Sequence, residues 1–287
     1  MANLSEHDTD QVQEANASDR VPVVFVHGLW LLPSSWDRWR TMFERAGYAT
    51  LAPGWPEDAD TVAAPNGRTD AFGGTTIGQI ADHFEAVIRA LGAKPAVVGH
   101  SFGGLLAEIL AGRGLASASV AIAPAPSRGV LPLPVSALRS AAPVGQHRAN
   151  DGPAHAGRAV PLTFDQFRHA FANAVDEQEA KDLFESFVVP GSGAPVIPAT
   201  NGNLDPWTGA KVQSKKPDRG PMLIIAAASD HTVPTAIADA SFRKQRRNAG
   251  VTEIVTMPGR GHSLTIDSGW NEVADATLAF VRRYAQP

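Results

Sequence analysis

Ala96-Val97-Val98-Gly99-His100-Ser101-Phe102-Gly103-Gly104 is the stretch of sequence on which the expected fold depends. Its first three residues form a short apolar run that predicts a buried strand, and a helical pattern runs from Leu105 to Ala111. A serine between a strand and a helix is held in a tight turn that presents its hydroxyl at the carboxyl edge of a sheet. Glycines two residues to either side are needed there, because a Cβ would collide with the crowded turn. Alone, such a pattern can be a glycine turn that only packs a helix on a strand. In this context it indicates a nucleophile.

Strand-like and helix-like segments alternate on both sides of this stretch. Apolar, mostly β-branched runs predict further strands at 21–26, 48–52, 118–123, 222–227 and 253–257. Apolar residues at helical spacing predict helices around Trp36, Trp39 and Phe43, and over 77–91, 235–247 and 271–284. Strands that alternate with helices are joined by right-handed crossovers into a mainly parallel sheet with helices on both faces. The sequence therefore predicts an α/β fold with about six strands.

The alternation is interrupted once, which suggests three regions. Residues 125–216 are rich in Pro, Ala and Gly, contain no good strand and are too long for a simple loop. They are interpreted as a mostly helical insertion after the fourth strand. The α/β core then comprises 21–124 and 217–287. Residues 1–20 are polar and acidic, so a disordered tail is expected there.

Composition excludes several classes of function. The 287 residues include 25 basic and 29 acidic side chains, a formal net charge of −4 that predicts no nucleic-acid partner. The basic run Arg243-Lys244-Gln245-Arg246-Arg247 is interpreted as a solvated helix face, with phosphate contact as the alternative. The absence of cysteine rules out a disulfide, a thiol nucleophile and a cysteine-ligated metal, and no metal is expected. The chain has neither a secretory signal pattern nor about 20 consecutive apolar residues, so a cytoplasmic protein without membrane insertion is expected.

A serine nucleophile needs a base, and His262 is the best placed of the nine histidines. It lies just beyond the last predicted strand, at the sheet edge where Ser101 is expected. The base in turn needs a carboxylate to hold its tautomer. Asp230 follows the strand at 222–227, whereas the chain after the fourth strand carries no carboxylate. Asp205 and Asp267 are less favoured, because one lies in the insertion and the other beyond His262. The competing interpretations are a surface-loop histidine and an ordinary helix-cap aspartate.

The oxyanion of a tetrahedral intermediate needs two N–H donors. The N–H of Phe102, directly after the nucleophile, is expected to be one of them. The loop after the first strand, His27-Gly28-Leu29-Trp30, should supply the other from Leu29, with Trp30 as the alternative. The His27 side chain is expected to form a hydrogen bond within its loop. His100 is expected to be a packing residue beside the serine.

Taken together, these motifs resemble the α/β-hydrolase superfamily over about 21–124 and 221–285. The resemblance implies a serine acyl-enzyme mechanism without a cofactor, and it implies that the insertion is a cap over the active site. Trp30, Phe164, Phe167 and Trp207 are the candidates for an apolar substrate-binding surface. Many members of the superfamily have two further strands before the His-Gly loop, whereas only the polar tail precedes Val21 here. The sheet is therefore expected to keep six strands.

The function expected from the sequence is hydrolysis of small carboxylic esters through Ser101, His262 and Asp230. The same residues serve thioesterases, lactonases and cofactor-free haloperoxidases, better described as perhydrolases. A non-catalytic small-ligand receptor of the same fold is the alternative from another class. A dinucleotide-binding enzyme is disfavoured, because no G-x-G-x-x-G follows the first strand. The sequence leaves the natural substrate and the oligomeric state open.

Overall fold

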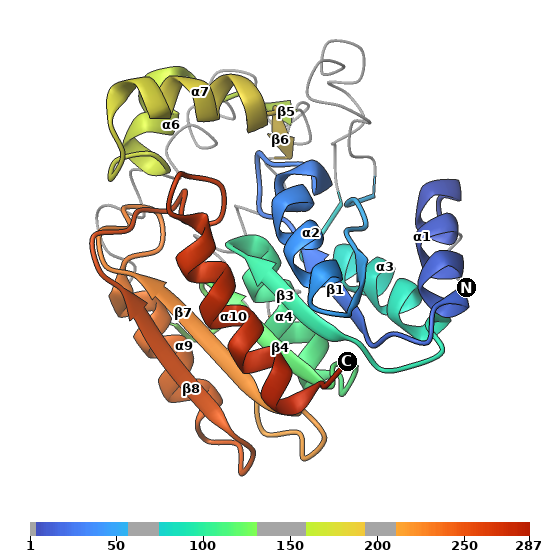
Figure 1. The fold of residues 1–287 in the computed structure, drawn as a ribbon. Coiled ribbons are helices and arrows are strands. Elements are labelled where there is room, and N and C mark those ends of the chain that lie inside the picture. Colours follow the sequence, from blue (N-terminus) through green and yellow to red (C-terminus); the bar gives the residue numbers. More distant parts are fainter. Residues whose placement is uncertain (1–3, 57–74, 131–158, 193–210) are drawn as a thin grey trace.

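The computed structural model describes residues 4–56, 75–130, 159–192 and 211–287 (Figure 1). Its centre is a six-stranded, fully parallel sheet with the strand order β2-β1-β3-β4-β7-β8. The strands are β1 (Pro22–Val26), β2 (Ala49–Leu51), β3 (Ala96–His100), β4 (Ala118–Ile122), β7 (Met222–Ala227) and β8 (Thr252–Met257). The predicted parallel sheet of six strands is thus confirmed.

Helices cover both faces of this sheet, as expected (Figure 1). On one face lie α2 (Asp37–Arg45), which a short 3-10 helix (Pro33–Trp36) precedes, and α10 (Trp270–Tyr284). On the other face lie α3 (Ile77–Ala90), α4 (Phe102–Gly112) and α9 (Thr235–Gln245). The inner strands are buried along their whole length, because each of their side chains meets one of these two helical layers.

The expectation of a disordered tail over residues 1–20 is wrong, because α1 (Glu6–Ala17) packs beside α3. Val12 and Ala15, three residues apart, are the buried apolar contacts of this helix. Its other attachments are polar: the Gln11 side chain accepts the Ala52 N–H at 2.8 Å, and the Asn16 side chain bonds to the backbone of Ala90 and Gly92 at the end of α3. A helix with few apolar residues is therefore held to the core largely by hydrogen bonds.

The described part of the insertion 125–216 contains α6 (Phe164–Ala170) and α7 (Glu177–Phe187). Both lie over the edge of the sheet at which the strands end (Figure 1). An antiparallel pair of two-residue strands, β5 (Ala159–Val160) and β6 (Gly191–Ser192), flanks them, although no strand was expected in this region. Residues 131–158 and 193–210 lie outside the described residues.

Candidate active site

Ser101 lies in a strained turn between β3 and α4. Its φ of 57° and ψ of −118° fall in a region that costs a non-glycine residue about 1–3 kcal/mol. The turn is held by its backbone, because the Ser101 N–H donates to Ile122 O at 2.9 Å and the Ser101 carbonyl accepts the Ala125 N–H at 2.9 Å. The two flanking glycines are sterically required. A Cβ on Gly99 would lie 1.9 Å from Gly103 O, and a Cβ on Gly103 would lie 2.0 Å from Val26 O.

The structure brings the three residues expected at the site into one hydrogen-bonded chain. His262 Nε2 lies 2.9 Å from Ser101 Oγ, and His262 Nδ1 lies 2.7 Å from Asp230 Oδ2. The three residues follow β3, β7 and β8, whose carboxyl ends share one edge of the sheet. The side chains of His262 and Asp230 are fully buried, so their interaction is little screened by solvent.

The second carboxylate oxygen of Asp230 fixes the direction of the hydrogen bonds between Asp230, His262 and Ser101. Oδ1 accepts the backbone N–H groups of Thr232 and Val233, each at 2.7 Å. Oδ2 is therefore left to accept the Nδ1–H of His262, and Nε2 of the neutral ring is then the acceptor that faces Ser101. This is the tautomer that can take the proton of the serine hydroxyl.

His100 lies against the ring of His262, with the two ring centroids 4.7 Å apart. Its Nε2–H donates to the His262 carbonyl at 3.0 Å. Burial, reinforced by the neighbouring His262, holds the pKa of His100 well below its ordinary value, so the ring stays neutral. A neutral ring tied to a backbone carbonyl acts here as a packing residue, as the sequence predicted.

The loop after β1 closes against Ser101. A Cβ on Gly28 would lie 3.0 Å from Ser101 Cβ and 3.1 Å from His100 O, so glycine favours the close approach of this loop. The next two residues, Leu29 and Trp30, are buried, and Trp30 has a φ of 65°. Among the described residues, no acceptor is recorded for the N–H of Leu29 or for that of Phe102. His27 forms the expected hydrogen bond within the loop, from Nδ1–H to Gly28 O at 2.9 Å.

Phe171, just after α6, lies at this site, although it is not among the four residues named as substrate-binding candidates from the sequence. Its ring meets the ring of His262 edge to face, with centroids 4.6 Å apart, and lies 6.0 Å from that of Trp30. Phe167 is buried behind Phe171 at a ring distance of 5.5 Å. Phe164 packs on Phe184, and Trp207 lies outside the described residues. Of the proposed substrate-binding residues, Trp30 therefore lies beside the site, whereas Phe167 lies in the layer behind it.

The segment around Phe171 is bonded to both loops that carry the acid and the base. The Ala170 carbonyl accepts the Thr232 hydroxyl at 2.7 Å, next to the Asp230 turn. The Phe171 carbonyl accepts the Ser263 N–H at 3.0 Å, directly after His262. Asn173 Nδ2 donates to Ser229 O at 2.7 Å. The insertion thus fixes the loops at this edge as well as lying over them.

The alternative carboxylate, Asp267, is occupied elsewhere. It is buried, and its oxygens accept from the Arg260 guanidinium and the Ser263 hydroxyl. Burial raises the pKa of Asp267, and the Arg260 charge opposes that rise. Asp205 lies outside the described residues. No group of three or more His, Asp or Glu side chains that could hold a metal occurs in the described ranges.

The parallel sheet with helices on both faces, and the three hydrogen-bonded side chains at its carboxyl edge, define an α/β-hydrolase fold. The chain belongs to the alpha/beta hydrolase family, whose model matches residues 23–276. Membership in this family supports the assignment of the chain to the hydrolases. None of the curated proteins compared with the sequence matches it.

Several solved structures share this fold at low sequence identity. A monoacylglycerol lipase of Paleococcus ferrophilus superposes with a TM-score of 0.63 at 20% identity, covering 92% of this chain and 95% of its own. A thermophilic esterase of Thermogutta terrifontis gives a TM-score of 0.62 at 16% identity, with 92% and 90% covered. A candidate non-heme bromoperoxidase of Mycobacterium tuberculosis H37Rv gives 0.63 at 20% identity, with 92% of each chain covered. At these identities the likeness establishes the fold alone.

Among the helices that the structure describes, none has the length and apolar character needed to cross a bilayer.

Proposed function

We propose that this chain is a serine hydrolase that cleaves small carboxylic esters, with Ser101 as nucleophile, His262 as base and Asp230 as the acid partner. The observation that carries the proposal is the unbroken hydrogen-bonded chain from Ser101 Oγ through the His262 ring to the Asp230 carboxylate. Its direction, set by the two backbone N–H groups on Asp230 Oδ1, leaves the histidine ready to accept the serine proton.

The reaction follows from these contacts. His262 Nε2 takes the proton of Ser101 as Oγ attacks the ester carbonyl, and Asp230 stabilises the imidazolium. The N–H groups of Phe102 and Leu29 donate to the oxyanion of the tetrahedral intermediate. His262 then gives the proton to the leaving alcohol, and an acyl-enzyme on Ser101 remains. Water, deprotonated by His262, attacks the acyl carbonyl, and the carboxylic acid leaves as Ser101 regains its proton.

The insertion 125–216 is proposed to act as a cap that selects the substrate. Two observations support this role: α6 and α7 lie over the edge of the sheet at which the strands end, and Phe171 meets the rings of both His262 and Trp30. Aromatic surfaces favour apolar acyl or alcohol groups, and each methylene changes discrimination by only about 1–3 kcal/mol. We therefore expect a graded preference among small esters rather than strict specificity.

Thioesters, lactones and peracid formation remain the alternatives on the same residues, because each proceeds through the same acyl-enzyme. A panel of p-nitrophenyl esters, thioesters and lactones, with hydrogen peroxide as a competing acceptor, separates them by relative kcat/KM. A receptor without catalysis would turn over none of them.

Replacement of the nucleophile tests the proposal. Ser101→Ala should abolish hydrolysis of p-nitrophenyl acetate in a protein that stays folded, and a fluorophosphonate probe should label the wild type at Ser101. Ser34→Ala, at an exposed serine, is the matched control and should keep both activity and labelling. Labelling of another serine, or turnover that survives Ser101→Ala, would refute the assignment.

A further inference from the structure

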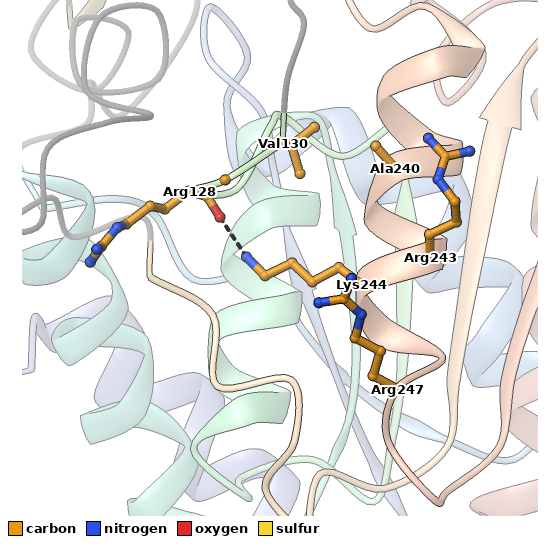
Figure 2. A pocket seen from close by; sticks show the side chains of 7 residues that line it. Arg128, Val130, Ala240, Arg243, Lys244 and Arg247 are labelled. Carbon is orange, nitrogen blue, oxygen red and sulfur yellow. Dashed lines mark hydrogen bonds between the residues drawn. The ribbon is translucent and has the colours of Figure 1, made fainter.

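A pocket of about 440 Å³ lies between the segment that follows β4 and the last turn of α9 (Figure 2). Val130 and Ala240 supply its apolar lining. Arg243, Lys244 and Arg247 line it as well, and all three belong to the basic run singled out in the sequence. None of the residues that carry the proposed hydrolysis lines it. The pocket has the size of a small-molecule site, for which about 300–1,000 Å³ is usual.

Within the described ranges, few protein groups offset the charges of Arg243 and Arg247 in this pocket. None of its lining residues is acidic, although the chain as a whole has a formal net charge of −4. The side chains of Arg243 and Arg247 are exposed, and no hydrogen bond or ion pair is recorded for either among the described residues. Arg128 also lines the pocket, but in Figure 2 its side chain extends away from Lys244 and only its carbonyl faces the ammonium. The free positive charge therefore comes from the end of α9.

Lys244 is fixed in place at the inner side of this group. Its ammonium donates to Ser127 Oγ at 2.9 Å and to Arg128 O at 2.7 Å, so one of its three N–H bonds remains. Burial lowers the pKa of Lys244; the charge of Glu108 opposes this, and the charges of Arg128 and Arg247 add to it. An anion in the pocket would relieve the repulsion between these cations.

A helix C-terminus alone does not account for this arrangement. Cations in the last turn of a helix are stabilised by its dipole, which explains Arg243 and Lys244 as single residues. The same preference applies to Arg246, whose guanidinium instead lies over the Phe242 ring at 5.9 Å and does not line the pocket. The dipole therefore explains basic residues here, but not the gathering of three of them around one cavity.

We propose that this pocket binds a small molecule through a phosphate or diphosphate group, at a site separate from Ser101. Two guanidinium groups can each offer paired N–H donors to phosphate oxygens, and the lysine adds a point charge. The pocket lies toward the end of α9 that is remote from Asp230, and this helix of 11 residues is about 16 Å long. Binding there can consequently be measured without reference to hydrolysis.

Calorimetric titration of the full chain with inorganic pyrophosphate, at constant ionic strength, tests this proposal. The wild type should bind saturably at one site. The double variant R243Q/R247Q should bind at least about tenfold more weakly, because guanidinium–phosphate bonds are charge-assisted. The matched control R45Q/R246Q also removes two exposed arginines at helix ends, outside the pocket, and should change the affinity by less than about twofold.

A nucleoside diphosphate and citrate complete the experiment. Tighter binding of the nucleoside diphosphate than of pyrophosphate would assign the ligand to phosphate esters, and equal binding would assign it to the inorganic group. The proposal is overturned if the wild type does not bind pyrophosphate, if R45Q/R246Q weakens binding as much as R243Q/R247Q, or if citrate binds as tightly as pyrophosphate. Unfolding curves in urea verify that the exposed substitutions leave the fold intact.

Discussion

Asp230→Asn is the substitution that most directly tests how the proposed site works. The asparagine is isosteric, and its carbonyl oxygen can still accept the N–H groups of Thr232 and Val233, which occupy Asp230 Oδ1 at 2.7 Å. The amide nitrogen must then face His262 Nδ1, where Asp230 Oδ2 now lies at 2.7 Å. Because that nitrogen is a donor, Nδ1 must become an acceptor and the ring proton moves to Nε2. A protonated Nε2 cannot take the proton of Ser101.

The expected loss follows from this change of tautomer. The corresponding substitution in a serine protease lowers kcat by about 10⁴-fold. At about 1.36 kcal/mol for each factor of ten, this is about 5.4 kcal/mol in the activation free energy. The free energy of unfolding should fall much less, by about 1–3 kcal/mol, because both backbone hydrogen bonds persist and the charge-assisted bond to His262 is replaced by a neutral one. Activity and stability should therefore separate by several kcal/mol.

The assay is kcat for p-nitrophenyl acetate, with urea unfolding of the same preparations. Asp239→Asn, the same change at an exposed position of α9, is the matched control and should keep the wild-type rate. Asp205→Asn tests the rival carboxylate in the insertion. A near-normal rate for Asp230→Asn, together with a large loss for Asp205→Asn, would refute the choice of acid and the tautomer argument with it.

Three further predictions concern strain, burial and selectivity. Ser101→Gly should unfold at higher urea concentration than Ser101→Ala, since a φ of 57° strains alanine but not glycine; equal midpoints would mean that the turn stores no such strain. Burial raises the pKa of Glu108 in the folded protein above its ordinary value of 4.5. The protonated carboxyl therefore contributes stability that is fully present below pH 4.5 and is lost as pH rises through the raised pKa of the folded state. The stability of Glu108→Gln relative to the wild type, measured by urea unfolding between pH 4 and 8, should therefore increase with pH, and a constant difference would contradict the raised pKa. Phe171→Ala should change the ratio of kcat/KM between butyrate and acetate esters while acetate turnover remains, because the Phe171 ring lies beside His262. Phe164→Ala, at a ring packed on Phe184, should leave the ratio unchanged. An unchanged ratio in Phe171→Ala, or loss of acetate turnover as complete as in Ser101→Ala, would contradict a role in selectivity alone.

The parts of this structure that the sequence predicts are those in which local pattern and long-range packing agree. Continuous apolar runs that are buried on both faces are typical of the interior of a parallel sheet, so the four inner strands β1, β3, β4 and β7 follow directly from the sequence. The edge strand β8 is only partly buried and rests on a weaker pattern. The turn at Ser101 is equally determined, because the collisions that a Cβ would make at Gly99 and Gly103 leave few alternatives. The order of the strands then places the loops of Asp230 and His262 at the same edge.

The parts that the sequence does not predict depend on contacts made by few or polar residues. The helix α1 escapes an argument from apolar content, since Gln11 and Asn16 attach it through hydrogen bonds to backbone groups far along the chain. Phe171 shares its helical pattern with Phe164 and Phe167, and periodicity alone cannot decide which ring reaches His262. The strands β5 and β6 have two residues each, too few for any alternation to be visible.

The backbone at the end of α6 holds the loops of the proposed site as well as lying near them. The carbonyls of Ala170 and Phe171 accept hydrogen bonds from Thr232 and Ser263, which adjoin the proposed acid and base. A substitution that displaces this segment therefore moves the loops of Asp230 and His262 as well as the surface near the substrate. A displacement of about 1 Å at a reacting group can lower the rate by about 10²-fold. Low activity in a variant of the insertion is consequently no evidence that the insertion supplies a catalytic group. A variant that changes only the substrate surface shifts the ratio between esters, whereas one that displaces the loops lowers kcat for every ester by the same factor, because the proton transfers are common to all of them.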